Sequence, residues 1–176
     1  MMSPQHNMGR FGGPPSRGQP ARDPHGETVT KYWPDYLKGG YFDEDGNLRI
    51  EYVSRDRVEL LVEKMCQDCV AEPFSQHQVR RYFGHCRALE TRLKGLSEEE
   101  KAARWKQVQV EVKKLDIAAA DGAAKQPKPK IPELFHDFIR RNVAAIKTHK
   151  DFLSGFLPHF EALVGFGQAH FKKERG

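Results

Sequence analysis

The sequence predicts an all-α protein, a compact bundle of about five helices. Two observations favour this fold: apolar residues recur at three- and four-residue spacing in five segments, and serine caps, glycines or prolines separate those segments. A chain of 176 residues suits one domain plus a tail. We therefore expect three parts: a disordered arm (1–31), an aromatic lead-in packed on the bundle (32–53) and a helical bundle domain (54–176).

The expected helices begin and end at recognisable signals. Ser54 caps the first, Pro132 fits the first turn of the fourth, and a basic, proline-containing linker spans 121–130. Pro158 has no N–H for a helical bond, so a kink or break is expected near Gly155 in the last helix. The helices should span about 55–71, 75–94, 98–118, 132–147 and 149–172.

The arm cannot bury enough apolar surface to offset its ordering entropy. We interpret it as a flexible tail, with an arm that orders on RNA or on a partner as the alternative. Its composition is five glycines (9, 12, 13, 18, 26), five prolines (4, 14, 15, 20, 24) and the spaced bases Arg10, Arg17 and Arg22.

The aromatic lead-in suggests a short hairpin. An Asp45-Gly46-Asn47 turn could join strands at 41–43 and 48–52. An isolated hairpin is marginal, so it should lean on the helices through Trp33, Tyr36, Leu37 and Phe42. The acidic turn lacks the ligand order of an EF-hand loop, and we do not expect it to bind calcium.

The helix expected at 75–94 carries most of the net charge. Ser75 and Gln78 form a capping box, and Phe74 with Val79 can form a hydrophobic staple. Five Lys/Arg stand against one acid in 74–94, a net of +4 in a chain whose formal net charge is +5. Its apolar stripe is Val79, Tyr82, Phe83, Cys86, Leu89 and Leu93, and its basic residues are Arg80, Arg81, Arg87, Arg92 and Lys94.

No catalytic, cofactor or metal motif stands out. Cys66 and Cys69 form a lone C-x-x-C inside the first expected helix, with Cys69 on its apolar stripe, so we interpret both as core residues. Glycine-rich phosphate loops and nucleophile motifs are missing. His77 and His85 lie on the basic helix, where they are solvated or touch a phosphate. We expect no enzyme activity, no cofactor and no metal.

Compartment follows from cysteine content and hydropathy. Three cysteines in a chain of this length make no disulfide framework, and the N-terminus lacks the apolar core of a secretory signal. Mean hydropathy is −0.72, and no apolar run approaches a membrane span. We expect a cytoplasmic protein with reduced thiols and no membrane partner.

Glu161 is an acid within the apolar stretch PHFEALVGF. It is either partly exposed, or it pairs with an arginine of the basic helix and holds that guanidinium in one orientation.

Four stretches together resemble the small subunit of type III-A CRISPR effectors, the Csm complex. YLKGGYFDEDGNLRIEYV resembles its lead-in, SQHQVRRYFGHCRALE its S-x-x-Q-[IV]-R-[KR]-[FY] helix, and FLPHFEALVGFGQAHFK its closing helix. Residues 112–125 fall where the family has a Lys/Tyr/Gly/Arg segment, but Ala118 or Ala119 replaces the Tyr and only Lys125 approximates the Arg. Gly165-Phe166 replaces the usual Ala-Tyr.

This resemblance implies an all-helical, non-catalytic protein of antiviral defence. Several copies would stack in the effector, beside its other subunits, and line the groove that holds crRNA paired to target RNA. Arg80 and Arg81 match the family's basic pair, and Glu161 its acid in the last helix. We predict RNA backbone contacts from Arg80, Arg81, Arg87, Lys94 and Lys125, supported by Glu161 and His77.

Two other functions stay open at this stage. Helix 75–94 could be the recognition helix of a DNA-binding protein, although residues 54–74 before it carry a net charge of −2. Alternatively the protein is a pure interaction bundle whose basic helix is merely solvated.

Overall fold

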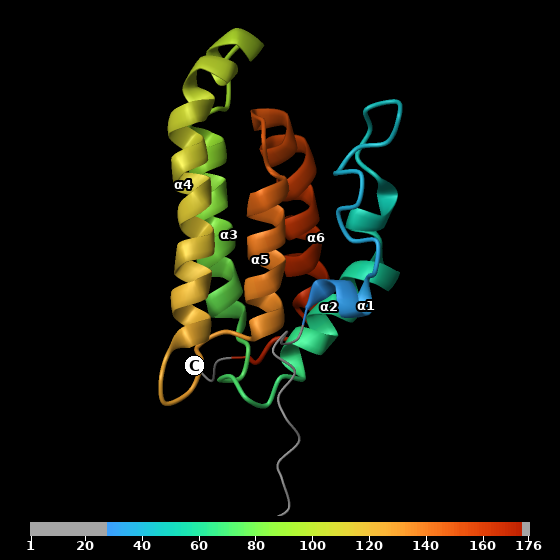
Figure 1. Cartoon of the computed structure of the whole chain (residues 1–176), viewed down its shortest axis with the longest axis vertical. Coiled ribbons are helices and arrows are strands. Elements are labelled where there is room, and N and C mark those ends of the chain that lie inside the picture. The colour runs from blue at the N-terminus through green and yellow to red at the C-terminus, as the bar shows by residue number, and fades with distance from the viewer. Residues whose placement is uncertain (1–27, 174–176) are drawn as a thin grey trace, which may run out of the picture.

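The computed structural model describes residues 28–173 (Figure 1). This part of the chain contains six α-helices, one 3₁₀-helix and one π-helix, and no strand. The all-α prediction is therefore confirmed. In chain order the elements are α1 (Val29–Tyr32), η1 (Ile50–Val53), α2 (Arg55–Cys66), α3 (Gln76–Thr91), α4 (Glu98–Ala124), α5 (Glu133–Ala145), η2 (Asp151–Phe156) and α6 (Leu157–Gly167).

Four helices, α3 to α6, run side by side along the long axis (Figure 1). Helix α4 packs on α5 and α3, and α3 packs on α6. The shorter α2 crosses the lower end of this bundle and contacts α6, while the lead-in covers the side of α6 away from α4 (Figure 1). As a result, α3 and α4 share one outer side of the molecule.

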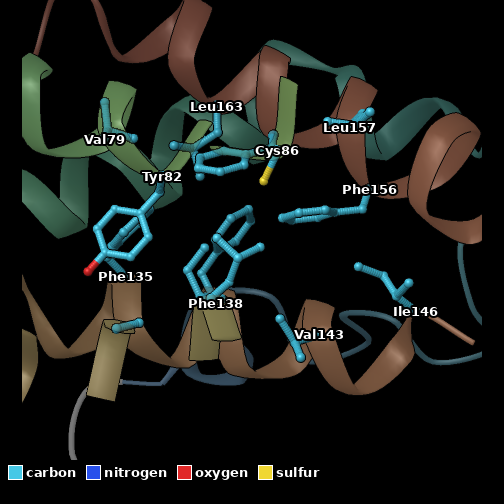
Figure 2. Close-up of a cluster of buried hydrophobic side chains, with 14 of the residues drawn as sticks. Val79, Tyr82, Cys86, Phe135, Phe138, Val143, Ile146, Phe156, Leu157 and Leu163 are labelled. Atoms are coloured by element: carbon cyan, nitrogen blue, oxygen red, sulfur yellow. The ribbon is translucent and has the colours of Figure 1, made fainter. Parts of the chain in front are cut away.

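The core is built from aromatic rings that meet between α3, α5 and α6 (Figure 2). Phe135 and Phe138 stack with an interplanar angle of 17°, and Phe138 lies 5.7 Å from Phe160 between ring centroids. Cys86 of α3 is fully buried among them, and this burial raises the pKa of its thiol to about 12. Cys86 is thus a packing residue of the helix that carries the basic side chains.

The capping box expected at Ser75 is present, and α4 begins with a second one. Ser75 Oγ accepts from the Gln78 amide while Gln78 Oε1 accepts from the Ser75 amide, and Ser97 with Glu100 repeats the arrangement at α4. Helix α4 runs six residues beyond its predicted end at 118, because the alanine-rich stretch that follows favours helix. The linker is correspondingly shorter than predicted.

The break expected near Pro158 is a π-helix. Element η2 ends at Phe156 and continues directly into α6, with Pro158 in the first turn of α6. The Tyr41 ring lies against Gly155 so closely that a Cβ there would be 2.6 Å from Tyr41 Cγ. The wide turn therefore gives the lead-in a place to dock.

The expected hairpin is reduced to one antiparallel bridge between Phe42 and Leu48. Asp43 Oδ1 accepts from the Asn47 amide at 2.8 Å and closes the turn. The second predicted strand is wrong: after Leu48 the chain enters η1, which buries Tyr52. Trp33 and Tyr36 are buried against the helices, as expected.

Four buried side chains with polar groups join the lead-in to the bundle. Tyr36 Oη is 2.8 Å from His159 Nε2 in α6 and accepts from Asn142 Nδ2 of α5. Asn142 Oδ1 accepts from the Tyr41 hydroxyl at 2.8 Å. Every strongly polar group in this cluster is thus paired, which satisfies the requirement for burying it.

Two sequence-based boundaries need correction. Helix α2 ends at Cys66, so Cys69 lies outside it and is exposed, because Asp68 caps the following turn through the Val70 amide. Residues 28–31, assigned to the arm, instead pack on the bundle, with Val29 fully buried. The remainder of the expected arm lies outside the described residues.

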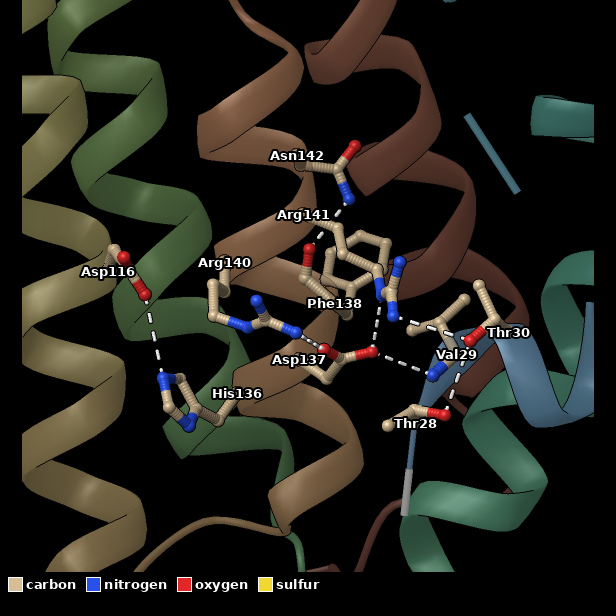
Figure 3. A network of polar contacts seen from close by, with 10 residues as sticks. All are labelled: Thr28, Val29, Thr30, Asp116, His136, Asp137, Phe138, Arg140, Arg141 and Asn142. Carbon is tan, nitrogen blue, oxygen red and sulfur yellow. Dashed lines mark hydrogen bonds and ion pairs between the residues drawn. The ribbon is translucent and has the colours of Figure 1, made fainter. Parts of the chain in front are cut away.

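Asp137 holds α1 on the bundle (Figure 3). Its Oδ2 accepts from the Val29 amide at 2.8 Å and from Arg141 Nε at 2.6 Å. Burial alone would raise the pKa of Asp137, but hydrogen bonds from Arg141, the Val29 amide and Arg140 outweigh it and lower the pKa. The carboxylate is an anchor for α1.

Candidate nucleic-acid interface

The exposed side of α3 carries two rows of basic residues. At 3.6 residues per turn, Arg80, Arg87 and Lys94 fall on one row, with Lys94 just past the helix end. A second row, about a third of a turn around the helix, holds Arg81, His85 and Arg92. The opposite side of α3 carries the buried stripe, so both rows face solvent.

Between the rows, two positions in the middle of α3 have little or no side chain. Gly84 and Ala88 are exposed there, and a Cβ added at Gly84 would meet nothing within 4 Å. We call the strip formed by Gly84 and Ala88 the trough. A phosphate backbone could approach the helix axis along it with cations on both sides, an arrangement that suits a polyanion.

Helix α3 is fixed to its neighbours at several points. Val79, Tyr82, Cys86 and Leu89 are buried. The Tyr82 hydroxyl donates to the Ala118 carbonyl of α4 at 3.1 Å, and Gln78 Nε2 donates to the Lys130 carbonyl at 2.5 Å. The two basic rows therefore stand on a rigid support.

The predicted contact residues differ in how far nearby acids neutralise them. Arg87 pairs with Glu90 at 2.6 Å, and Lys125 pairs with Asp121 at 2.9 Å. Within residues 28–173, no carboxylate lies within ion-pair distance of Arg80, Arg81 or Lys94. These three exposed cations are the most available for a phosphate.

Lys125 stands apart from the rows, at the C-terminal end of α4. That end lies beside the start of α3, because Gln78 and Tyr82 bond across to it. His77 is exposed in the first turn of α3 and lies between the two rows around the helix. Both positions extend the basic surface along α3.

Glu161 is exposed on α6. The preceding residue, Phe160, is fully buried with its ring 5.3 Å from Phe83 of α3, and Glu161 points about 100° away from it around the helix. No Lys or Arg in the described part of the chain is within ion-pair distance of it. The brace to an arginine is not formed in this structure.

Helix α4 adds a cation that the sequence analysis did not select. Lys114 joins Arg81 and His85 around a pocket of about 350 Å³ between α3 and α4. Its neighbour Lys113 points elsewhere and donates to the Val143 carbonyl of α5 at 3.1 Å. The sequence hinted at this cation through the Lys113–Lys114 pair, near the start of the 112–125 segment that resembles the family. Only the packing of α3 on α4 decides which of the two lysines faces the pocket.

Cysteine and metal chemistry receive no support. Across residues 28–173 there is no group of three His, Cys, Asp or Glu side chains that could hold a metal ion. Burial raises the pKa of the Cys66 thiol to about 11, which disfavours the reactive thiolate. None of the helices in that range has the length and apolar character needed to cross a membrane.

Fold and site together define a class: a small α-helical protein that presents a basic face on one rigid helix. The sequence profile described as Csm2 Type III-A matches residues 56–173, well over half of the chain. The chain belongs to this family, the small subunits of the type III-A CRISPR effector. Comparisons with curated proteins and with solved structures gave no match.

The match contains α3, the trough and the 112–125 segment, and it ends at the last described residue, Lys173. It begins at Asp56, in the first turn of α2. The lead-in is therefore outside the matched range, although its aromatic side chains are part of the same core.

Proposed function

We propose that this protein is a non-catalytic subunit that lines the groove of the Csm complex and binds the backbone of target RNA paired to crRNA. The observation that carries the proposal is the pair of basic rows on α3 with the trough between them. Arg80 and Arg81, one in each row, would contact phosphates, with Arg87, Lys94 and Lys125 extending the track and His77 and Glu161 supporting it.

Such a surface has little means of reading sequence. It offers cations on a rigid helix, and its aromatic residues Tyr82 and Phe83 are turned toward the core. In RNA-guided complexes base pairing supplies specificity, so a groove subunit needs charge placed along a backbone. Binding should therefore depend strongly on salt and weakly on sequence.

Stacking of several copies, next to the other subunits of the complex, is part of the same proposal. Helix α4 carries exposed apolar side chains at seven-residue spacing, Val110 (57% exposed) and Ile117 (69% exposed). Seven residues are close to two helical turns, so both side chains lie on one face of α4. That face would meet a neighbouring subunit. The working location would be the cytoplasm, as part of antiviral defence.

The test uses the assembled effector complex carrying Arg80→Ala plus Arg81→Ala. We expect retention of target RNA to fall at least tenfold, and the slope of log affinity against log salt to drop by about 2, since two phosphate contacts are lost. Lys38→Ala plus Lys147→Ala removes two exposed cations outside α3 and serves as the charge-matched control.

Equal losses of target RNA retention in both double variants would indicate a general effect of net charge and would contradict the proposed role of α3. Tighter binding of DNA duplex than RNA duplex by the full chain would favour the DNA-binding alternative. Unchanged RNA retention in both variants would favour a pure interaction bundle.

A further inference from the structure

The pocket between α3 and α4 differs in character from the trough. Its floor is apolar and comes from both helices: the buried residues Tyr82 and Leu115 and the half-buried Ala118. Its rim consists of Arg81 and His85 from α3 and Lys114 from α4. No acidic side chain lines it, so one end of a ligand would meet cations and the other an apolar surface.

The floor is held open by its own contacts. The Tyr82 hydroxyl is committed to the Ala118 carbonyl, and the Tyr82 ring packs edge-on against Phe135 with centroids 5.2 Å apart. Tyr82 therefore cannot swing outward to fill the space. Ala118 contributes only a methyl group where a larger side chain would close the pocket.

The rim cations are available. Arg81 has no acid within ion-pair distance among residues 28–173, and His85 is exposed. Lys114 Nζ forms an ion pair with Glu111 Oε1 at 2.8 Å, but the lysine side chain is 57% exposed and such a surface pair is weak. A phosphate arriving at the rim could displace Glu111 at little cost.

The size suits one nucleotide. About 350 Å³ is at the small end of ligand pockets and gives room for a ligand no larger than one nucleotide. Guanidinium and imidazole groups stack on bases, as aromatic side chains do. The pocket has no side-chain carboxylate or amide to read a base edge, so any base would be accepted.

We propose that this pocket receives one unpaired nucleotide of bound RNA, with its base on the floor of Tyr82, Leu115 and Ala118 and its phosphate between Arg81 and Lys114. The inference rests on the proposed function, because Arg81 also belongs to a row beside the trough. A strand that follows the trough passes the mouth of the pocket, where an unstacked base could turn in.

The test measures binding of the full chain to three RNA duplexes by fluorescence anisotropy. One duplex is fully paired, one has a single-nucleotide bulge, and one has the same bulge without its base. We expect the bulged duplex to bind about tenfold more tightly than the paired one, and the abasic bulge to lose that gain. All four bulge bases should give similar gains.

Ala118→Phe fills the pocket and should abolish the gain while leaving affinity for the paired duplex unchanged. Ala120→Phe, at an exposed position on the same helix, is the matched control. His85→Ala is a second variant, for use if Ala118→Phe fails to fold. It leaves the floor intact and should reduce the gain in affinity from the bulge.

The outcomes separate the two proposals. Salt-dependent binding of the paired duplex without a gain from the bulge overturns the pocket and leaves the proposed function standing. An equal gain from the abasic bulge, or a gain that survives both variants, also overturns it. Failure to bind any of the three duplexes contradicts the proposed function itself.

Discussion

His159 accepts a hydrogen bond from the Tyr36 hydroxyl through Nε2, at 2.8 Å, and both side chains are buried. The direction follows from the other ring nitrogen. Nδ1 lies 2.6 Å from the Tyr52 carbonyl, which can only accept, so Nδ1 carries the hydrogen. The neutral tautomer is thus fixed, and the lead-in, which supplies both tyrosines, depends on it.

This histidine predicts acid sensitivity. Burial lowers the pKa of His159 to about 4, against 6.5 in the unfolded chain. Its contribution is constant above pH 6.5, where both states are neutral. Between pH 6.5 and 4 only the unfolded chain takes up the proton, so about 3 kcal/mol of stability should be lost. Urea unfolding at several pH values measures this loss.

The matched variant is His159→Asn, which cannot titrate. Its stability should start lower and fall less over the same pH range. Parallel curves for the two proteins would mean that other groups carry the acid sensitivity.

Gly155 should tolerate no side chain. Gly155→Ala places a Cβ against the Tyr41 ring, so Tyr41 or η2 must shift. We expect a loss of about 1–3 kcal/mol in the free energy of unfolding, typical of overpacking. Gly165→Ala, in α6 with nothing within 4 Å of the new Cβ, should be neutral or slightly stabilising. If both variants melt together, the close packing of Tyr41 does not constrain the π-helix.

The trough predicts a charge-specific effect on RNA affinity. Gly84→Glu sets a carboxylate between the two basic rows, where it repels a phosphate and pairs with the flanking arginines. Affinity for an RNA duplex should fall about tenfold or more, as measured by filter binding at low salt. Gly84→Ala adds only a methyl group and no charge, so this variant should bind RNA like the unaltered protein.

A second control guards against a general charge effect. Ala120→Glu adds the same charge at an exposed position on α4. An equal loss from this variant would show that the position of the acid is immaterial, and the trough would lose its assigned role.

The exposed apolar face of α4 predicts an assembly defect. Val110→Glu plus Ile117→Glu should reduce incorporation into the Csm complex at least tenfold, because burial of one such side chain contributes about 1.5–3 kcal/mol. The subunit ratio after purification of the complex measures this. Val70→Glu, at another exposed apolar position (55%), should have no effect; normal incorporation of the double variant would place the subunit contacts elsewhere.

Local signals in the sequence were sufficient to place the starts of the helices, whereas several ends were wrong: α2 ends at Cys66 instead of 71, α3 at Thr91 instead of 94 and α6 at Gly167 instead of 172. The Ser75 and Ser97 boxes and the break before Pro158 each depend on residues within one or two turns, so the sequence pattern contains all the partners. The all-α fold class and the basic side of α3 could be predicted from the spacing of apolar and basic residues along the sequence.

Features that depend on tertiary packing escaped the sequence analysis. The pocket exists because α3 and α4 meet at Tyr82 and Ala118, 36 positions apart, and spacing within either helix cannot show that. The same holds for His159, which looked like one of eight scattered histidines and is a buried link. Cys69 was misplaced because an Asp68 turn, rather than helix periodicity, governs the chain there.

The backbone bond from the Lys172 amide to the Phe74 carbonyl brings the end of the described chain beside the first turn of α3. A label attached at Lys172 or Lys173 would therefore start beside the first turn of α3, on the approach to the basic rows. The same proximity is useful for a probe. A fluorophore on Lys173→Cys, after Cys69→Ser removes the exposed native thiol, would report RNA arriving along α3.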